Sequence, residues 1–339
     1  MSRQRILVIQ TAFLGDAILT LPMIQELYKK FNQPAIDVIA IPSTAEIFSA
    51  SPYIEKVIVY DKHKSQRSLF SLFGFIKKIK KANYSYIYSP HRSLRTSLIV
   101  FFSNAKNTVG FNTSALSFVY KQEIKYNASF HEVARNLSLI DFDIKDDKWK
   151  ILPKIKITSD IEKKIDSFLK RIKEKRIVAI APGSVWPTKK YPVEYFEKII
   201  GYLNKKNYFV VLLGGKEDSE LCSKLYQTNT EMIESFAGRL SIVESIELIK
   251  RSSLIICNDS APTHMAMAAN IPTLAIFCST VPDFGFYAYN STSENISYDD
   301  LKCKPCGIHG HRECPIKTFD CGYKLLPEQV FEKIENILA

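Results

Sequence analysis

The sequence predicts an α/β protein with two domains, each built on a parallel sheet that helices cover. Along the first half of the chain, short apolar runs rich in β-branched residues alternate with longer segments of helical periodicity. The same alternation begins again after a polar, charged stretch at residues 143–160. Strands that alternate with helices in this way are typical of parallel sheets with both faces buried. A length of 339 residues also suits two domains, which we expect at residues 1–155 and 156–339 with a cleft between them.

Strand–helix pairs make up the first predicted domain. Each predicted strand is a short apolar run, and each predicted helix repeats its apolar residues every three or four positions. In order, the pairs are ILVIQ with AILTLPMIQELYKKF, IDVIAIP with TAEIFSA, KVIVY with SLFSLFGFIKKIKK, and YSYIYSP with LRTSLIVFF. HEVARNLSLIDF then predicts an amphipathic helix, and the polar DIKDDKWKILPKIKITSD is the candidate linker.

The second predicted domain repeats this rhythm without repeating the sequence. Its successive elements are RIVAIAPG, VEYFEKIIGYLNKK, YFVVLLGG, DSELCSKLYQ, SIVESIELIKR, SLIICND, THMAMAA and TLAIFCS. Ser241 and Glu244 form a capping box that marks the start of one helix. The final PEQVFEKIENILA is an amphipathic helix that the sequence assigns to neither domain.

Composition and charge limit the classes of function. With 46% hydrophobic and 24% charged residues, the chain is not a disordered protein. Its 46 Lys and Arg against 35 Asp and Glu give a formal charge of +11, which favours an anionic partner such as nucleic acid, a phosphorylated sugar or an anionic membrane. Solvated lysines on helix faces are the alternative reading. No run reaches the ~20 apolar residues that span a bilayer, and no signal-peptide cleavage site follows ILVIQTAFLG, so we expect a cytoplasmic protein.

Ligands of open α/β sheets bind beyond the carboxyl ends of the strands, so the loops there are the candidate sites. The first loop, TAFLGDA, lacks both G-x-G-x-x-G and G-x-x-x-x-G-K-[ST], which argues against a nicotinamide dehydrogenase and a P-loop nucleotidase. It carries Asp16 near the start of a helix. The residues alone favour an N-cap there, with a catalytic carboxylate as the alternative.

Two further loops carry charged residues, each with two alternative roles. In IAPGSVWPTKKYPVEYF, Lys189 and Lys190 precede a helix that opens at Pro192, where they either reach an anion or stay solvated. In VVLLGGKEDSE, Glu217 and Asp218 open a helix, where acids complement the helix dipole or hold ribose hydroxyls.

The most informative loop is LIICNDSAPTHMAMAAN. A buried strand leads into Asn258, Asp259 and Ser260, and a helix then begins around Pro262 with Thr263 and His264 in its first turn. Free N–H groups at a helix start, hydroxyls and a histidine suit a phosphate or diphosphate. A core histidine beside an Asp or Ser cap is the alternative.

These segments together resemble the heptosyltransferase family of bacterial glycosyltransferases, glycosyltransferase family 9, which builds the inner core of lipopolysaccharide. The resemblance rests on GDAILTLP, HEVARNLSLI, PGSVWPTKKYP, LLGGKED, NDSAPTHMAMAA and KCKPCGIHGHRECP, and it covers nearly the whole chain. It implies the GT-B fold, two Rossmann-like domains that face each other across a cleft. The donor is then held mainly by the second domain and the acceptor by the first.

The resemblance also implies the reaction and the roles of single residues. Asp16 matches the family's proposed catalytic base, which takes the proton of an acceptor hydroxyl as that oxygen attacks the anomeric carbon of ADP-heptose with inversion. The implied donor site, which needs no metal or other cofactor, consists of Lys189, Glu217, Asp259, Ser260, Ala261, Thr263 and His264. Ala261 departs from the family's D-[ST]-G-x-x-H pattern, in which glycine is usual, and this departure bears on the identity of the donor sugar.

The acceptor implied by the resemblance is a lipopolysaccharide core that contains Kdo. Candidate anion-binding residues in YDKHKSQRS and SPHRSLRTS are Lys62, Lys64, Arg67, Arg92 and Arg95. Surface cations without a function are the alternative. The positive charge is also compatible with peripheral contact between the enzyme, expected to be a monomer, and the anionic inner membrane on its cytoplasmic face.

The cysteines divide into two groups. Cys222, Cys257 and Cys278 lie in or beside predicted elements and are expected to be small buried hydrophobes. The second group, in a predicted loop with His309 and His311, contains the C-x-x-C that forms half of many zinc sites: Cys303, Cys306, Cys314 and Cys321. We consider a structural zinc here, with reduced thiols as the alternative.

Three rival classes of function explain less of the sequence. A zinc-dependent nucleic-acid-binding protein uses the charge and the cysteines but leaves NDSAPTH and PGSVWPTKKYP unexplained, so no nucleic-acid partner is expected. A non-catalytic sugar-nucleotide-binding module has no use for Asp16. A hydrolase with a nucleophile elbow requires G-x-S-x-G, which is absent from the sequence.

Overall fold

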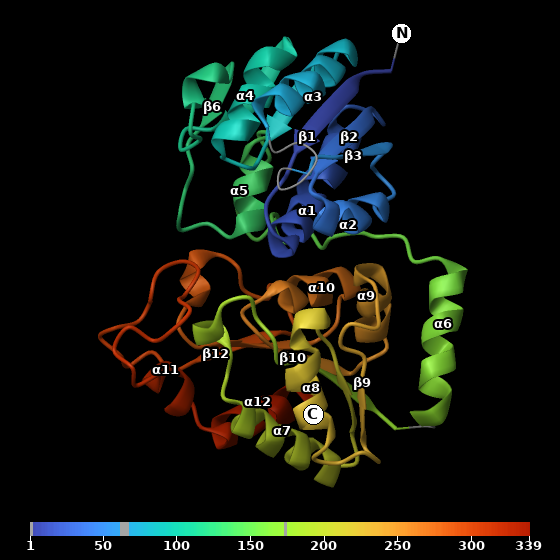
Figure 1. The fold of residues 1–339 in the computed structure, drawn as a ribbon, viewed down its shortest axis with the longest axis vertical. Helices are drawn as coiled ribbons and strands as arrows, with labels where there is room; N and C mark the ends of the chain where they lie inside the picture. The colour runs from blue at the N-terminus through green and yellow to red at the C-terminus, as the bar shows by residue number, and fades with distance from the viewer. Residues whose placement is uncertain (1–2, 62–67, 173–174) are drawn as a thin grey trace. The chain divides into compact units, whose positions relative to one another are not determined.

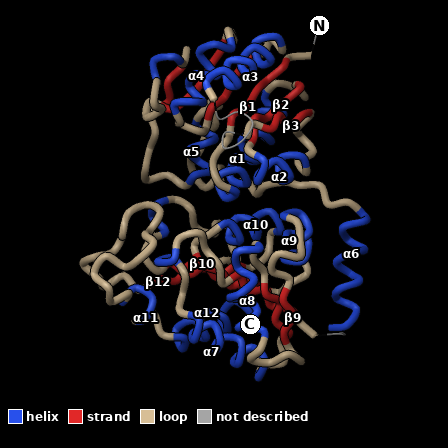
Figure 2. The backbone as a smooth tube through the Cα atoms, in the orientation of Figure 1, coloured by secondary structure: helices blue, strands red, loops and turns tan. Residues whose placement is uncertain are grey.

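The computed structural model describes residues 3–61, 68–172 and 175–339 (Figure 1). The chain divides into two compact units, Met1–Lys156 and Ile157–Ala339, whereas the sequence placed the boundary between residues 155 and 156. Each unit contains one sheet of six strands with helices on it, which confirms the predicted α/β class (Figure 2).

The sheet of the first unit has the strand order β3-β2-β1-β4-β5-β6, and all neighbouring strands are parallel. Its strands are β1 (Arg5–Ile9), β2 (Ala35–Ala40), β3 (Lys56–Val59), β4 (Tyr86–Ser89), β5 (Asn107–Phe111) and β6 (Gln122–Ile124). Every residue of β2 is buried, as expected for a strand covered on both faces.

Helices of the first unit fall into two packed groups. They are α1 (Leu14–Lys30), α2 (Ala45–Ser49), α3 (Leu69–Lys81), α4 (Leu94–Ser103) and α5 (Glu132–Ser138). Helix α1 packs against α2 and α5, whereas α3 packs against α4. The predicted helix in HEVARNLSLIDF is present as α5, but its first six residues are all buried, so the expected amphipathic pattern is not realised. Residues 139–158 form neither helix nor strand, and of the predicted linker at residues 143–160 only Ser159 and Asp160 are helical, as the start of α6.

The sheet of the second unit has the order β12-β11-β10-β7-β8-β9 and is likewise parallel throughout. Its strands are β7 (Ile177–Ala181), β8 (Phe209–Leu212), β9 (Ile233–Ser235), β10 (Leu254–Asn258), β11 (Thr273–Phe277) and β12 (Glu294–Ser297). Numbered within its own unit, this order is the same 3-2-1-4-5-6 as in the first. The two halves therefore repeat a doubly wound topology that the sequence showed only as a shared rhythm.

The helices of the second unit are α6 (Ser159–Leu169), α7 (Val193–Lys205), α8 (Ser219–Tyr226), α9 (Ile242–Lys250), α10 (Ala261–Ala269), α11 (Asp320–Tyr323) and α12 (Pro327–Leu338). The capping box predicted for Ser241 and Glu244 is confirmed at the start of α9. Helix α12 belongs to this unit, because Val330 and Ile334 are buried in its core and α12 packs against α7. Among the described helices, none is long and apolar enough to cross a membrane.

The topology selects one place in each sheet where a ligand is expected. Chain direction across a doubly wound sheet reverses between its two central strands, and a crevice opens there beyond their carboxyl ends. In the first unit this switch point lies between β1 and β4, and in the second between β7 and β10. The segments that follow these four strands carry Asp16, in the first turn of α1, and Arg92, Lys189 and Asp259.

Candidate active site

The loop after β1 places Asp16 in the first turn of α1. Helix α1 begins at Leu14, and its N-cap residue is Phe13, whose side chain makes no capping hydrogen bond. Asp16 is therefore not the N-cap residue, and the interpretation that the residues alone favoured is wrong. Its side chain is partly exposed at the carboxyl end of the sheet.

Hydrogen bonds fix this loop to its own helix and to the loop after β4. Gln10 Nε2 donates to Thr20 Oγ1 over 2.9 Å, and Thr20 Oγ1 donates to the Asp16 carbonyl oxygen over 2.8 Å. Thr11 Oγ1 and His91 Nδ1 are hydrogen-bonded at 2.8 Å. The switch-point loops of the first unit are thus joined through His91, a contact that no sequence pattern indicated.

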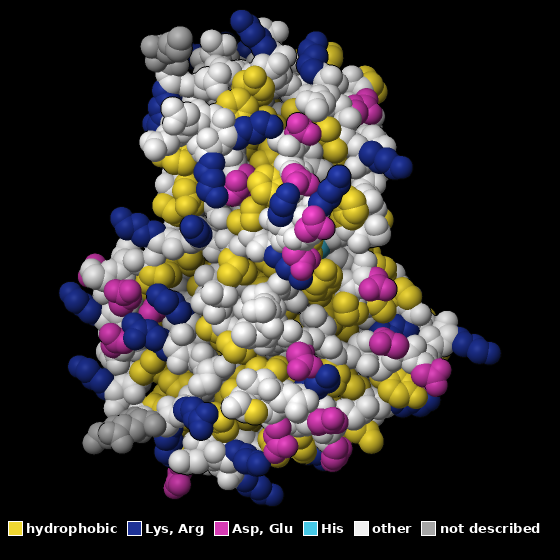
Figure 3. Space-filling view, turned by 180° about the vertical axis from the view of Figure 1, so that it is seen from behind, with side chains coloured by type: hydrophobic (Ala, Val, Ile, Leu, Met, Phe, Trp, Pro, Cys, Tyr) yellow, Lys and Arg dark blue, Asp and Glu magenta, His cyan; other side chains and the backbone are white. Residues whose placement is uncertain are grey.

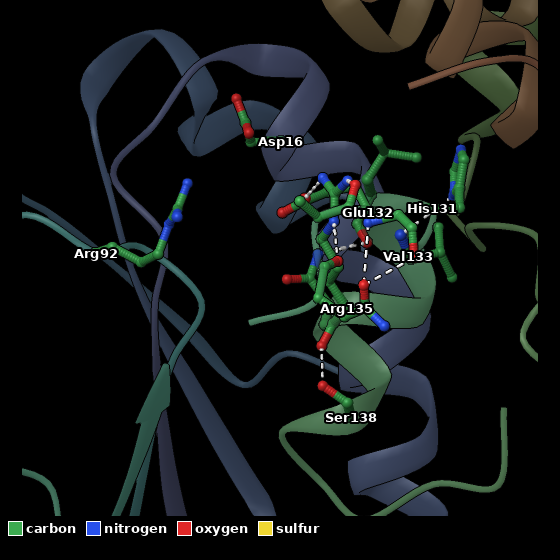
Figure 4. A network of polar contacts seen from close by, with 12 residues as sticks. Asp16, Arg92, His131, Glu132, Val133, Arg135 and Ser138 are labelled. Atoms are coloured by element: carbon green, nitrogen blue, oxygen red, sulfur yellow. Dashed lines mark hydrogen bonds and ion pairs between the residues drawn. The ribbon is translucent and has the colours of Figure 1, made fainter. Parts of the chain in front are cut away.

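Glu132 and Arg135 form a buried ion pair beside Asp16 (Figure 4). Glu132 is the first residue of α5, and its Oε2 lies 3.0 Å from Arg135 Nη1. Arg135 also donates to the carbonyl oxygens of Asn127 over 3.1 Å and Ala128 over 2.5 Å. The guanidinium group therefore has acceptors on three sides, as a buried cation requires.

The start of α5 is itself held in place. His131 is its N-cap, with Nδ1 accepting the Val133 backbone N–H, and its ring stacks on Trp149 with centroids 4.8 Å apart. Asn136 Nδ2 donates to the Leu19 carbonyl oxygen over 3.1 Å, which fixes α5 against α1. Glu132 is consequently positioned relative to the helix that carries Asp16.

One electrostatic cluster contains the carboxylates of Asp16 and Glu132, the guanidinium groups of Arg92 and Arg135, and the phenol of Tyr126. Burial raises the pKa of Glu132 to about 7, and the charge of Asp16 raises this pKa as well, against the opposing influence of Arg135 and Arg92. The guanidinium of Arg92 lies 4.0 Å from the ring centroid of Tyr126, and that of Arg135 lies 5.1 Å from it. Burial, with Glu132 next, raises the pKa of Tyr126. A carboxyl group that titrates near neutrality is suited to proton exchange.

The predicted acceptor residues have different surroundings. Arg92 belongs to the cluster around Tyr126 and also donates to Thr113 Oγ1 over 3.2 Å. Arg95 Nη1 donates to the hydroxyl of the buried Tyr60 over 2.9 Å. Lys62, Lys64 and Arg67 lie outside the described residues.

In the second unit, Lys189 and Asp259 form a nearly buried ion pair between the two switch-point loops. Lys189 Nζ lies 2.6 Å from Asp259 Oδ2, and the two side chains are 13% and 8% exposed. Thr280 Oγ1 donates to the same carboxylate oxygen over 2.6 Å. The loops after β7, β10 and β11 thus converge on one charged pair.

Asn258 joins the same loops through its amide. Its Nδ2 donates to the Pro182 carbonyl oxygen over 2.7 Å, and its Oδ1 accepts the Tyr191 backbone N–H over 3.0 Å. Ser260 Oγ donates to the Asn258 carbonyl oxygen over 3.2 Å. A fully buried amide that satisfies backbone groups on both sides of Lys189 keeps this loop in one conformation.

Helix α10 begins at Ala261, next to the ion pair. Its N-cap residue Ser260 makes no side-chain capping bond, and Thr263 Oγ1 donates back to the Asn258 carbonyl oxygen over 3.2 Å. His264 is buried, and its Nδ1 has no hydrogen-bond partner among the described residues. Burial lowers the pKa of His264 to about 4, so the imidazole is neutral at neutral pH. The ring nitrogen Nδ1 is thus buried, neutral at neutral pH and unpaired among the described residues.

The acids after β8 have separate surroundings. Asp218 Oδ2 accepts the Gly215 backbone N–H over 3.0 Å, and a Cβ on Gly183 would come within 2.2 Å of the other carboxylate oxygen. Gly183 is therefore required for the close approach of the loops after β7 and β8. Glu217 is exposed, and nothing in the structure tests its predicted contact with the nucleoside.

The cysteine-bearing segment packs against the loop that carries Lys189. His311 donates its backbone N–H to Thr188 Oγ1 over 2.7 Å, and Thr188 Oγ1 donates to the His311 carbonyl oxygen over 3.0 Å. The rings of Trp186 and His309 are stacked with centroids 6.2 Å apart. The segment thus supports one wall of the candidate donor site, a role that the sequence did not indicate.

The cysteines themselves only partly follow the expectations. Cys222, Cys257 and Cys278 are buried, as predicted, while Cys321 lies in α11 and in the core rather than in a loop. Burial raises the pKa of Cys321 to about 11, so this thiol is protonated at neutral pH. Within residues 3–61, 68–172 and 175–339, no three or more His, Cys, Asp or Glu side chains are arranged to hold a metal ion. The thiols in this geometry do not fit a zinc ion, and zinc stays a prediction.

Comparison with known protein families identifies the family of this chain. The model of glycosyltransferase family 9 (heptosyltransferase) matches residues 72–317, well over half of the chain. The chain belongs to this family. As a family 9 member it is a glycosyltransferase, as the resemblance predicted.

Relatives of this family 9 glycosyltransferase match it over nearly its full length. Lipooligosaccharide heptosyltransferase 2 of Campylobacter jejuni is 24% identical over 333 residues, which cover 96% of each chain. The structure of E. coli ADP-heptose lps heptosyltransferase II is similar with a TM-score of 0.80 and 19% identity, covering 99% of this chain and 98% of that one. E. coli heptosyltransferase WaaC with ADP-2-deoxy-2-fluoro heptose has a TM-score of 0.73 at 16% identity, with coverage of 98% and 99%. These likenesses confirm the predicted GT-B fold.

Proposed function

We propose that this glycosyltransferase transfers heptose from ADP-L-glycero-D-manno-heptose to the inner core of lipopolysaccharide. The names of its relatives support heptose as the sugar, and WaaC has been solved with ADP-2-deoxy-2-fluoro heptose. The observation that carries the proposal is the Lys189–Asp259 pair at the start of α10, with the unpaired His264 Nδ1 behind it. In a family 9 glycosyltransferase, these are groups suited to a nucleotide diphosphate and its sugar.

The proposed reaction is a single displacement with inversion. The oxygen of an acceptor hydroxyl forms a bond to the anomeric carbon while the bond from that carbon to the diphosphate oxygen breaks. The proton of the hydroxyl passes to the carboxylate of Asp16, and ADP leaves with the electron pair of the broken bond. The Glu132–Arg135 pair and Arg92 set the electrostatic surroundings of this base.

Donor binding is assigned to the second unit. The ammonium of Lys189 and the N–H groups at the start of α10 stabilise the negative charge that grows on the leaving diphosphate, without calling on a metal or other cofactor. Asp259 holds Lys189 in position through the 2.6 Å ion pair. The remaining donor contacts that we propose are those of Glu217 with the nucleoside, and of Ser260, Ala261, Thr263 and His264 with the diphosphate and the sugar.

Acceptor binding is assigned to the first unit. Arg92 and Arg95 are proposed to bind phosphate or carboxylate groups of a Kdo-containing core, together with Lys62, Lys64 and Arg67. Arginine suits these anions because its planar guanidinium donates two parallel hydrogen bonds. We propose that the enzyme acts on the cytoplasmic side of the inner membrane.

A transfer assay tests the proposal. Purified protein is incubated with ADP-heptose and either a Kdo-terminated or a monoheptosyl core acceptor, with UDP- and GDP-sugars as parallel donors, and products are followed by mass spectrometry. We expect one heptose to be added to one of the two acceptors and no transfer from the other donors. Transfer only from a UDP- or GDP-sugar would contradict the assignment of heptose while leaving the family unchanged.

A further inference from the structure

Helices α3 and α4 expose a cluster of phenylalanine side chains. Phe70, Phe73, Phe101 and Phe102 are 91%, 54%, 57% and 40% exposed. The rings of Phe73 and Phe102 have centroids 5.7 Å apart, and those of Phe101 and Phe102 are 4.9 Å apart. Phe70 lies one helical turn from Phe73 on the same helix. We call these four residues the α3–α4 patch. Single exposed apolar residues are common, but a contiguous aromatic cluster marks an interaction surface.

Lysines continue the same face of α3. At i, i+3, i+7 and i+11, one exposed stripe of the helix carries Phe70, Phe73, Lys77 and Lys81. The opposite face packs into the core of the first unit through Leu72, Phe75, Ile76 and Ile79. Lys78 and Lys80 flank the stripe and are also exposed. In the described part of the chain, no ion pair involves any of these four lysines.

The excess positive charge of the protein lies in the segment that contains this surface. Residues 62–122 include 11 Lys and Arg and no Asp or Glu, which leaves 35 basic and 35 acidic residues in the rest of the chain. On the face drawn in Figure 3, basic and acidic side chains are interspersed. The net charge alone does not distinguish among anionic partners. The location of that charge, next to exposed aromatic rings, does distinguish among them.

We propose that the α3–α4 patch and the lysines of α3 form a docking surface for an anionic lipid bilayer. Aromatic rings enter the boundary between headgroups and acyl chains, and lysines beside them contact anionic headgroups, the pattern by which peripheral helices bind membranes. A nucleic acid would use the charge but has no need of four exposed phenylalanines on α3 and α4. A protein partner would use the rings, but lysines are depleted in protein–protein interfaces, and this surface carries four of them. The docking is independent of the identity of the donor sugar.

Vesicle binding without any substrate tests the proposal, so its failure is distinguishable from failure of the proposed reaction. The full chain is sedimented with vesicles of phosphatidylcholine alone or with added phosphatidylglycerol and cardiolipin. We expect binding to the anionic vesicles that weakens with salt and little binding to phosphatidylcholine. Equal binding to both, or binding to neither, would overturn the proposal.

Paired substitutions locate the surface. Lys77→Glu with Lys81→Glu should weaken binding by at least fivefold for each lysine, since a lysine near an anionic membrane contributes about that factor. Phe70→Ser with Phe73→Ser should weaken it by about tenfold or more. The control is Lys198→Glu with Lys205→Glu, at exposed positions of α7. It changes the net charge by the same amount as the Lys77→Glu, Lys81→Glu variant. Its binding to anionic vesicles should fall by no more than about twofold beyond the general effect of the lower net charge. Equal loss in control and test variants would contradict the assigned surface.

Fluorescence provides a readout that does not depend on weakened binding. In a Phe70→Trp variant, the new indole emission should shift to the blue with anionic vesicles and be quenched by lipids brominated on their acyl chains. An Ile316→Trp variant in the second unit should respond to neither, although Ile316 is also exposed. An unquenched Trp at position 70 in vesicle-bound protein would overturn the proposal. So would a dimer in solution that the Phe70→Ser, Phe73→Ser variant converts to monomer, because a second copy would then be the occupant.

Discussion

Replacing Glu132 by Gln should change how the stability of the first unit depends on pH. The pKa of Glu132 is raised from the ordinary value of 4.5 to about 7 in the folded protein. Between these two values the folded state holds a proton that the unfolded state has lost, so stability must fall as pH rises through this window. Above pH ~7 both states are ionised, and this contribution stops changing.

The size of the effect follows from the shift. A difference of about 2.5 pKa units corresponds to about 3 kcal/mol of unfolding free energy, at 1.36 kcal/mol per unit. The wild type should therefore lose about 3 kcal/mol from this group between pH ~4.5 and pH ~7.5. Glu132→Gln keeps an acceptor for Arg135 Nη1 but has no proton to lose. The unfolding free energy of the variant minus that of the wild type should therefore rise by about 3 kcal/mol between pH ~4.5 and pH ~7.5. Any pH-independent difference between the two proteins does not affect this rise.

Urea unfolding followed by tryptophan fluorescence measures this difference. The chain has 2 tryptophans, and Trp149 stacks on His131 in the first unit, so a Trp186→Phe background leaves one reporter next to α5. Glu123→Gln, which removes a carboxylate at an exposed position in β6, is the matched control. Asp16→Asn should lower the pKa of Glu132 and shrink the effect. A Glu132→Gln difference that stays constant with pH would refute a raised pKa and the coupling to Asp16.

Three further predictions concern the second unit. Lys189→Ala and His264→Ala should each weaken ADP binding about tenfold or more in calorimetric titrations, because a charge-assisted or buried hydrogen bond is lost, and unchanged titrations would remove both residues from the donor site. Thr188→Val should lower the unfolding free energy by about 1–3 kcal/mol, since the backbone N–H of His311 loses its acceptor while the His311 carbonyl keeps only the Thr188 backbone N–H, and an unchanged melting temperature would contradict this packing. Metal analysis of protein prepared with zinc should find less than a tenth of an ion per chain, because the described thiols are not arranged to hold one. About one ion per chain, lost on replacing Cys303 and Cys306, would contradict this geometry and support the structural zinc considered from the sequence.

Local pattern was enough to predict the class of fold and the position of its loops. Alternating apolar runs and helical periodicities encode βαβ units whatever the order of the strands, so the α/β class and two similar halves could be read directly. The order itself, which places β1 beside β4 and β7 beside β10, depends on pairings between distant segments. It could not be derived from any local signal, although it decides which loops meet.

At the candidate site too, the features that could not be predicted from the sequence depend on contacts between distant segments. Glu132 looks like an ordinary acid in the first turn of a helix, and its raised pKa arises from burial and from Asp16, which is far away in sequence. The contact between His311 and Thr188 likewise joins distant segments. The error at Asp16 was local instead. The predicted helix start differed by two or three residues from the observed one, and this difference separates an N-cap residue from a residue of the first turn.

The rate of transfer by an Asp16→Asn variant is the most direct test of the central claim, that a nucleotide-heptose is transferred with this carboxylate as the base. Heptose transfer from ADP-heptose to the acceptor used by the wild type would be followed by mass spectrometry, and ADP affinity would be measured on the same preparations. Our account predicts that transfer falls by ~10²-fold or more while ADP affinity is unchanged. Transfer at a near-normal rate would contradict it and leave Asp16 with a structural role in the first turn of α1.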